Sequence, residues 1–316
     1  MKIAAVTVVK NDGDVLEEFV RHTLKFVDRL VIVNNGSLDE TQKILRALEA
    51  ESLRLTVWDD HVVAPEPELL AILARKAFSE TKADFLLLLD ADEFIRTGSR
   101  EVLEKALVAL PENAHALIPW VTYVPSPKDD VLARGVLSRL RWRRRSEAMQ
   151  FCKLVLHRSF VDRPNATLCF GNHEILDVPA PRVESLDGIE LAHFPVRSLR
   201  QIQNKALLGW SMFMAMGFGE QNDIAFQWKR LYGNLLSTAE WTELDLFQYA
   251  LHYLDNDGDA PELVFDPLPT VECLYPHTTP RLVETAVAYT RQLALAYAEL
   301  RVENRQLRAS IDAQAS

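Results

Sequence analysis

The first ninety residues alternate between short, almost entirely apolar runs and longer segments in which apolar residues recur with helical spacing. The apolar runs are predicted to be strands, at residues 3–9, 30–33, 53–58 and 84–89. The segments between them are predicted to be helices, at residues 16–27, 38–50 and 67–80. Strands that are apolar on both faces are typical of a parallel sheet that helices cover on both sides. The sequence therefore predicts an α/β, Rossmann-like fold with a mostly parallel sheet.

Net charge and cysteine content exclude several classes of protein. The net charge of −10 excludes a general attraction to nucleic acid. Three cysteines, Cys152, Cys169 and Cys273, are too sparse for a disulfide framework and favour a reducing compartment. The N-terminus lacks the features of a signal peptide, and no apolar stretch is long enough to cross a membrane. We therefore expect a cytoplasmic protein.

Three carboxylates crowd at the end of the fourth predicted strand, in "LLLLDADEFI", residues 86–95. Ligands of open α/β sheets bind beyond the carboxyl ends of the strands, which is where Asp90 and Asp92 are expected. Two carboxylates one residue apart can hold Mg²⁺ or Mn²⁺, which prefer oxygen ligands and leave positions open for phosphates. Two alternatives are a solvated acidic turn and a D-x-D phosphatase in which Asp90 is the nucleophile.

Four segments together resemble family 2-like glycosyltransferases of the GT-A fold, and within them the bacterial subgroup whose motif is "DADEF". They are "VVKNDGDVLEEFVRHTLKFVDRLVIVNNGSLDET", "ADFLLLLDADEFI", "FCKLVLHRS" with "FGNHEI", and "LAHFPVRSLRQIQNKALLGW". The resemblance covers residues 1–210, with a nucleotide-binding half at 1–100 and an acceptor-side half at 101–210. Residues 211–316 are expected to be a helical C-terminal region.

The resemblance implies metal-dependent transfer of a sugar, with inversion, from a nucleotide-diphosphate donor to a glycan or lipid-linked acceptor. Surface polysaccharide, lipopolysaccharide or other glycan biosynthesis is the expected setting. The metal, Mn²⁺ or Mg²⁺, would be held by Asp90 and Asp92, with His193 as a third ligand. The expected donor-binding residues are Lys10, Asn11, Asn34, Asp39, Asp60, Asp90, Arg197 and Lys205. Arg197 and Lys205 have the chemistry to clamp a diphosphate, Arg197 by a bidentate fork.

Inverting transfer needs a base that removes the proton of the acceptor hydroxyl. The stretch "GNHEILD" offers His173, Glu174 and Asp177, and Glu174 lies about where the family places its acidic residue. Glu93 is a further alternative. Gly171 is expected to let the backbone approach a ligand closely.

Three sequence segments after residue 134 are candidates for contacts outside the expected metal and donor site. "GVLSRLRWRRR", residues 135–145, alternates as a strand with Arg139, Arg141, Arg143 and Arg145 on one face, for an anionic acceptor, a membrane surface or solvent. "LLGWSMFMAMGF", residues 207–218, favours a core or subunit interface over peripheral contact with the inner membrane. A 4-3 apolar spacing predicts a last helix that packs as in a coiled coil, against a second subunit; it comprises Leu282, Ala286, Tyr289, Leu293, Ala296, Leu300 and Leu307. A non-catalytic scaffold acting through this helix is the alternative to an enzyme.

Overall fold

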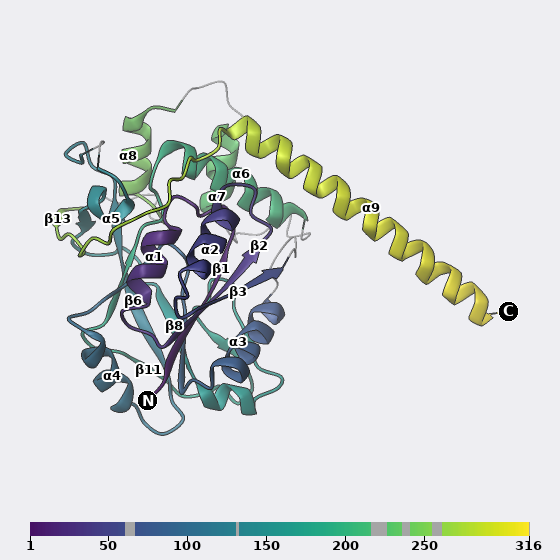
Figure 1. The fold of residues 1–316 in the computed structure, drawn as a ribbon, viewed down its shortest axis with the longest axis horizontal. Helices are drawn as coiled ribbons and strands as arrows, with labels where there is room; N and C mark the ends of the chain where they lie inside the picture. The colour runs from purple at the N-terminus through teal and green to yellow at the C-terminus, as the bar shows by residue number, and fades with distance from the viewer. Residues whose placement is uncertain (61–66, 131–132, 216–225, 236–240, 255–260, 316) are drawn as a thin grey trace.

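The structure is a computed structural model that describes residues 1–60, 67–130, 133–215, 226–235, 241–254 and 261–315 (Figure 1). Its body is built around one large sheet, and a long C-terminal helix projects from this body (Figure 1). No helix in the described ranges is both long and apolar enough to cross a membrane.

Four parallel strands form the N-terminal part of the sheet, in the order β3-β2-β1-β4. They are β1 (Ile3–Val9), β2 (Arg29–Asn35), β3 (Leu55–Asp60) and β4 (Phe85–Leu88). Along β1, Ile3 and Ala5 pack in the core on one face of the sheet, while Ala4 and Val6 pack in the core on the other. Burial on both faces explains why these strands are apolar without alternation.

Helices cover both faces of this parallel part, as predicted. The helices α1 (Leu16–Thr23), α2 (Thr41–Ala50) and α4 (Arg100–Val108) contribute to one core, and α3 (Pro67–Thr81) contributes to the other. The apolar positions of α1, such as Leu16, Phe19 and Val20, are fully buried, so its amphipathic pattern accounts for its packing. The predicted α/β fold is confirmed.

The remaining large strands bring further strand ends to the edge of the sheet at which β1 and β4 end. β8 (Cys152–His157) runs antiparallel to β4 and to β6 (His115–Val124), so β6 has the direction of β4. β12 (Glu190–His193) is parallel to β6 and antiparallel to β5 (Glu93–Arg96). The carboxyl ends of β1, β4, β6 and β12 therefore meet the amino end of β8 at one edge.

The other elements complete the body and the C-terminal region. They are α5 (Val136–Arg139), β7 (Trp142–Arg144), the 3-10 helix η1 (Arg158–Asp162), β9 (Thr167–Leu168), β10 (Ile175–Leu176), β11 (Val183–Ser185), α6 (Leu199–Ala215), α7 (Phe226–Leu235), α8 (Glu243–Leu251), β13 (Leu263–Phe265) and α9 (Leu282–Ala315). The predicted boundary near residue 210 falls inside α6, and β13 extends the main sheet by pairing with β7. The C-terminal region is thus structurally joined to the first part.

The arginine-rich run is not the single strand that its alternation predicts. It divides into the one-turn helix α5 and the short strand β7. Arg143 pairs with Asp266, and Arg145 pairs with Glu262. Arg139 donates to the carbonyl of Arg197, and the Arg141 guanidinium lies over the Phe265 ring. Because the four arginines contact other parts of the chain, they do not form the free cationic face that the pattern suggested.

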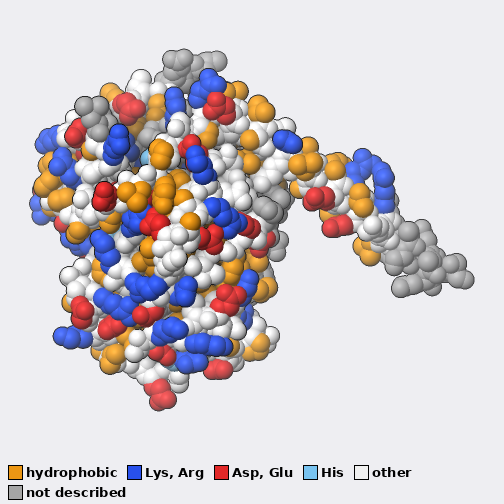
Figure 2. All heavy atoms as spheres, viewed as in Figure 1, with side chains coloured by type: hydrophobic (Ala, Val, Ile, Leu, Met, Phe, Trp, Pro, Cys, Tyr) orange, Lys and Arg blue, Asp and Glu red, His pale blue; other side chains and the backbone are white. Residues whose placement is uncertain are grey.

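The last helix, α9, contacts α6 near its start and then leaves the body (Figures 1 and 2). Tyr289 is buried against the body, whereas Leu295, Leu300 and Leu307 are exposed. The stripe of 4-3 apolar residues therefore serves intramolecular packing in its first half. Self-association through its second half stays a prediction.

Candidate active site

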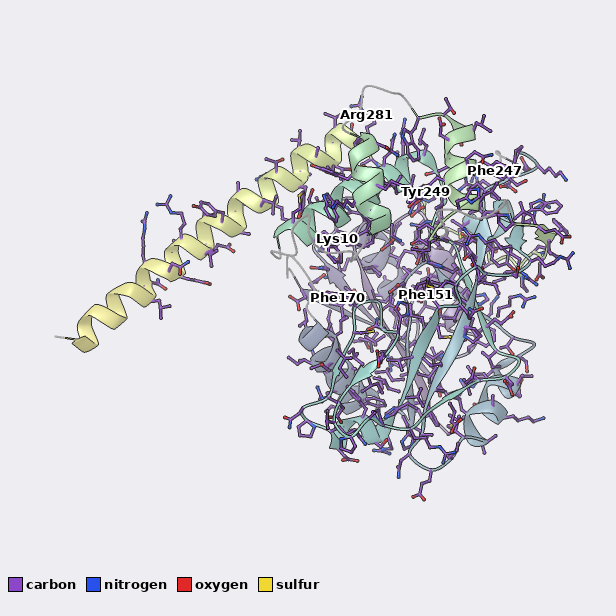
Figure 3. All side chains as sticks on the ribbon, turned by 180° about the vertical axis from the view of Figure 1, so that it is seen from behind. Lys10, Phe151, Phe170, Phe247, Tyr249 and Arg281 are labelled. Atoms are coloured by element: carbon purple, nitrogen blue, oxygen red, sulfur yellow. The ribbon has the colours of Figure 1, made fainter. Side chains whose placement is uncertain are left out.

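A cavity of about 560 Å³ opens where the strand ends meet. Its lining comes from the ends of β1, β4, β8 and β12, from one face of α6, and from the segment before α9. Lys10, Phe151 and Phe170, which Figure 3 labels, lie on different parts of its wall. Both aspartates of "DADEF" line it, so the cavity is the candidate active site.

Asp90 stands at the mouth of the cavity, with 51% of its side chain exposed. Its Oδ2 accepts a hydrogen bond of 2.6 Å from Nζ of Lys153, a β8 side chain that is only 2% exposed. Burial alone would lower the pKa of Lys153, but Asp90 and Glu93 outweigh burial and raise it. Lys153 is therefore a buried, permanently charged partner of Asp90.

Glu93 lies behind this turn and is fully buried. Its Oε2 accepts a 2.9 Å hydrogen bond from the backbone N–H of Asp90, and Oε1 is 3.5 Å from Lys153 Nζ. Burial raises the pKa of Glu93 well above its usual value. Since Glu93 does not line the cavity, the geometry assigns it to holding the turn and not to catalysis.

Asp92 is buried at the centre of a cationic cluster. Its Oδ2 accepts hydrogen bonds from Lys205 Nζ at 2.8 Å and from Arg197 NH1 at 3.2 Å. Burial alone would raise the pKa of Asp92, but the cations Lys205 and Arg197 hold it below its usual range. The carboxylate therefore stays ionised, as a metal or donor ligand must be.

Arg197 is 1% exposed, and each of its nitrogens already has an acceptor. It makes a bidentate pair with Asp14, through Nε at 2.7 Å and NH2 at 2.8 Å. Its other hydrogen bonds go to Asp92, Asp12 and the carbonyl of Phe194. A guanidinium has five N–H donors, and these contacts use all five. In this structure no donor of Arg197 is left for a diphosphate, and its contacts indicate that it positions Asp92. Since Arg197 also lines the cavity, the diphosphate clamp stays a prediction.

We expect Arg197→Met to destabilise the protein by about 3–5 kcal/mol, because it leaves the largely buried Asp14 without its cation and removes one of the two cations beside Asp92. Urea unfolding followed by circular dichroism measures this loss. Arg145→Met removes an arginine that is 61% exposed and pairs with a glutamate, and it should leave the unfolding midpoint unchanged. Equal midpoints for the two variants would contradict the positioning role.

His193, the expected third metal ligand, lines the cavity beside Asp92. The pairing of His193 with Glu93, between β12 and β5, fixes this position, and the backbone N–H of Phe194 donates to the carbonyl of Asp92 at 2.8 Å. The ring packs on Trp120 at 4.5 Å, and burial lowers the pKa of His193 to about 3. The imidazole is therefore neutral, with an electron pair available for a metal.

The side chains around Asp92 and His193 provide only some of the ligands that a divalent cation needs. His193 Nε2 lies 3.9 Å from Asp92 Oδ1, too far for a hydrogen bond, and His193 Nδ1 has no partner among the described atoms. Within the described ranges, no three His, Cys, Asp or Glu side chains form a ready metal site. A neutral imidazole with carboxylates fits Mn²⁺, and Mg²⁺ and related ions often take the rest of their ligands from substrate phosphates and water.

The charges of the cavity also favour a bound cation. Its lining contains six carboxylates, Asp12, Asp14, Asp39, Glu40, Asp90 and Asp92, and four cations, Lys10, Lys153, Arg197 and Lys205. Burial raises the pKa of Asp12 to about 7, so one carboxylate is partly protonated at neutral pH. The remaining excess of negative charge opposes entry of a diphosphate unless a cation enters with it.

The predicted donor-binding residues divide into two groups. Lys10, Asn11 and Asp39 line the cavity. Asn34 and Asp60 do not. Asn34 is buried, donates to Asp59 at 3.2 Å and accepts from the backbone of Ser37, so it supports the loop and leaves Asn35 to face the cavity. The prediction for Asn34 and Asp60 as direct donor contacts is therefore wrong in this structure.

The three candidates for the catalytic base also separate. Glu174 is exposed outside the cavity, and Asp177 pairs with Arg163 away from it. His173 lines the cavity, and its Nδ1 lies 2.6 Å from the carbonyl oxygen of Cys152. A carbonyl accepts only, so Nδ1 must carry the proton and Nε2 presents an unshared electron pair. Of the three candidates, Glu174 and Asp177 lie outside the cavity in this structure, and His173 lines it.

Gly171 is required by His173 itself. Its φ is +80°, and a Cβ there would lie 2.5 Å from His173 Nε2. The following Asn172 also has a positive φ, of 58°. This left-handed turn directs His173 inward and Glu174 outward. Gly171 itself lines the cavity, so a close approach of its backbone to a ligand stays a prediction.

A C-terminal segment, residues 274–280, contributes to the cavity wall, and no pattern in the sequence indicated this. Glu17, buried in α1, accepts hydrogen bonds from the backbone N–H groups of Leu274 and Tyr275, both at 2.8 Å. Asn204 of α6 donates to the carbonyl of Pro280 at 2.9 Å. His277 to Pro280 then line the cavity. We call residues 274–280 the C-terminal strap.

Sequence reasoning also missed Asp14 and Lys153 as members of the site. "KNDGD" contains Asp14 close to Lys10 and Asn11, so proximity was available as a signal. Lys153 stands alone in an apolar strand, a position that is unfavourable for a charge unless it is paired. Its partner Asp90 lies 63 positions away in the chain.

Known proteins resemble this chain in sequence and in fold. Residues 4–166 match the family model described as glycosyl transferase family 2. No curated protein matches the chain. Among solved structures, S. aureus TarS 1–349 in complex with UDP is similar at 14% identity, covering 80% of this chain and 79% of that one, with a TM-score of 0.41. The mannosyltransferase PcManGT from Pyrobaculum calidifontis with GDP-Man and Mn²⁺ covers 76% of each chain at 12% identity and a TM-score of 0.40. GalNAc-T7 with UDP, GalNAc and Mn²⁺ covers 80% of this chain and 56% of that one at 11% identity and a TM-score of 0.41.

Proposed function

Because this chain belongs to glycosyl transferase family 2, we propose that it transfers a sugar, with inversion, from a nucleotide-diphosphate donor to an acceptor hydroxyl. The observation that carries the proposal is Asp92, an ionised, buried carboxylate between Lys205, Arg197 and His193 at the end of β4. The D-x-D phosphatase and the non-catalytic scaffold have no observation in their favour beyond the motif and the last helix. Family membership favours the transferase over both.

Asp90, Asp92 and His193 would hold Mn²⁺ or Mg²⁺ together with the diphosphate of the donor. A bound divalent ion would supply neutralisation of the charge that builds on the departing diphosphate. Lys205 is 31% exposed and bonded to Asp92, which supports the proposal that it contacts the same phosphates. Lys10, Asn11, Asn35 and Asp39 form the part of the wall that suits the nucleoside.

His173 is proposed as the base. The acceptor oxygen forms a bond to the anomeric carbon, and the bond from that carbon to the diphosphate oxygen breaks with its electron pair on the diphosphate. The acceptor proton goes to Nε2 of His173, whose tautomer the Cys152 carbonyl fixes. Burial lowers the pKa of His173, so the ring is unprotonated at neutral pH. Attack from the face opposite the leaving diphosphate gives inversion.

A panel of nucleotide sugars tests the proposed function. The purified protein is incubated with Mn²⁺ and each donor, and release of nucleoside diphosphate is measured with and without candidate acceptors. We expect one nucleotide class to be hydrolysed slowly alone and faster with acceptor. Release of inorganic phosphate from a generic phosphate ester, with no donor turned over, would favour the phosphatase instead.

We propose a cytoplasmic setting in the biosynthesis of a surface polysaccharide, lipopolysaccharide or related glycan. The absence of a membrane-spanning helix in the described ranges is compatible with this setting. On the face shown in Figure 2, basic and acidic side chains are interspersed, which does not favour nucleic acid as a partner. Peripheral contact with the inner membrane stays a prediction.

The C-terminal strap should set the affinity for the donor. Glu17→Ala removes both acceptors that hold Leu274 and Tyr275, and we expect the donor KM to rise about tenfold, which corresponds to about 1.4 kcal/mol, with kcat little changed. Glu49→Ala, which removes a partially exposed α2 carboxylate paired with Arg46, is the control. Steady-state kinetics with varied donor concentration measures KM for both variants. An unchanged donor KM for Glu17→Ala would exclude a role of the C-terminal strap in donor affinity.

A further inference from the structure

The apolar run on α6 is neither simple core nor a free surface, because one face of this helix lines the cavity. Gln201, Asn204 and Lys205 face the cavity near the start of the helix, and Leu208 and Met212 face it further along. These positions are three or four residues apart, which places them on one side of a helix. The wall therefore changes from polar to apolar along α6, and residues 216–218 of the run lie outside the described residues.

Other elements continue the apolar end of this wall. The Phe170 ring lies 5.9 Å from the Phe213 ring, and Phe213 lies 5.5 Å from Trp228 of α7. Leu73 of α3 lines the same cavity. We call this surface the apolar wall; it consists of Leu73, Phe170, Leu208, Met212, Phe213 and Trp228.

Gly209 permits this arrangement. A Cβ at Gly209 would lie 2.6 Å from the Trp228 ring, so only glycine lets the indole lie against the backbone of α6. Trp228 is thereby held beside Phe213, and the three aromatic rings form one continuous surface. The close packing of Trp228 on Gly209 therefore fixes the aromatic part of the apolar wall in the cavity.

The apolar wall begins beside the proposed reaction centre. Phe170 precedes Gly171 and His173 in the same loop. On α6, Met212 follows Lys205, the partner of Asp92, by seven residues, which corresponds to about 10 Å along a helix. A molecule that places a hydroxyl at His173 can therefore extend along α6 away from the diphosphate.

The chemistry of the wall selects what extends along it. None of its six side chains is charged, and their one polar atom, the indole Nε1 of Trp228, is buried without a partner in the described part of the chain. A sugar residue there would leave several hydroxyls without partners, which is unfavourable. A hydrocarbon chain has no such requirement. Resting on the proposed transferase function, we propose that the acceptor is an amphiphile: a sugar hydroxyl at His173, with a hydrocarbon chain attached to that sugar along the apolar wall.

Alkyl glucosides of increasing chain length test this inference. Methyl, butyl, hexyl and octyl β-D-glucoside are titrated below their micelle concentrations into the full-length protein, and binding is measured by calorimetry. We expect one site per chain and an affinity that rises roughly fourfold per methylene group, the fold-change that corresponds to about 0.8 kcal/mol per buried CH₂. The rise should level off when the chain passes Met212.

Two methionines on the same helix give a matched pair of variants. Met212 lines the cavity, whereas Met214 is 39% exposed and does not. Met212→Asn should flatten the dependence of the affinity on chain length. Met214→Asn should behave as the wild type.

Three outcomes would overturn the inference: no dependence on chain length, a dependence that Met212→Asn leaves intact, or tighter binding of an unmodified trisaccharide than of octyl glucoside. The last would indicate a glycan acceptor. Binding of UDP and GDP with Mn²⁺ is measured on the same samples. Diphosphate binding without chain-length dependence contradicts only the inference, whereas chain-length dependence without diphosphate binding contradicts only the proposed function.

Discussion

Asp92→Asn is expected to lower kcat/KM for the donor by about a thousandfold, which corresponds to about 4 kcal/mol of transition-state stabilisation. Asparagine keeps the shape of the side chain but removes the charge that Lys205 and Arg197 neutralise. It also removes the ionised ligand that the proposed metal requires. Donor turnover at saturating Mn²⁺ measures the loss.

The matched control for this variant lies at the other end of the same strand. Asp84 precedes β4 and accepts a hydrogen bond from the backbone of Lys2, far from the cavity edge. Asp84→Asn should retain wild-type turnover. Circular dichroism should show both variants folded. Activity of Asp92→Asn within tenfold of the wild type would contradict the role of Asp92.

His173→Gln is expected to lower kcat by about 10²–10⁴-fold, the usual contribution of a positioned base, with the donor KM unchanged. Glutamine cannot accept the acceptor proton, but it can still donate a hydrogen bond towards the Cys152 carbonyl. His157→Gln, at the opposite end of β8 and bonded to Ser159, is the control and should have no effect on kcat.

The pH profile separates a base from a structural histidine. Because burial lowers the pKa of His173, the neutral, active form persists as pH falls from 8 towards about 6.5, and kcat/KM should fall only below that range. His173→Gln should lower kcat/KM and should also abolish its fall at acidic pH, the acidic limb of the profile. A variant with reduced rate and an unchanged limb would show that another group is the base.

The N-terminal fold was predictable because its signals are local. The strands β1, β2 and β4 are largely apolar on both faces, and the helices between the strands carry their own apolar spacing, so these elements needed no distant information. The D-x-D motif was likewise predictable, since it follows a buried strand directly. Lys10 and Asn11 also follow a buried strand directly, whereas Asp39 was placed in the nucleotide pocket by the resemblance to family 2-like glycosyltransferases.

The rest of the site depends on contacts between distant segments. The positioning role of Arg197 follows from Asp14 and Asp92, which lie 183 and 105 positions away. Glu174 was preferred because it lies about where the family places its acidic residue. Sequence alone does not give the side-chain direction in a loop with two left-handed residues. Positive φ at Gly171 and Asn172 decides that direction.

The arginine run shows the limit of periodicity. Its alternation fits a strand, yet the first half winds into α5, and the carboxylate of Glu18 accepts hydrogen bonds from the backbone N–H groups of Val136 and Leu137 at the start of this turn. Glu18 is 118 residues from Val136, so no local pattern reports the contact. The same holds for Glu17 and the C-terminal strap.

The central claim is that Asp90 and Asp92 join a divalent ion and a nucleoside diphosphate in one site. Calorimetric titration of UDP and of GDP into the wild-type protein, with and without Mn²⁺, tests it most directly. The account predicts that one diphosphate binds at least about a hundredfold more tightly with Mn²⁺, which corresponds to about 2.7 kcal/mol, and that Asp92→Asn abolishes this gain. Equal affinity with and without the metal, or no binding of either diphosphate with any divalent ion, would contradict it.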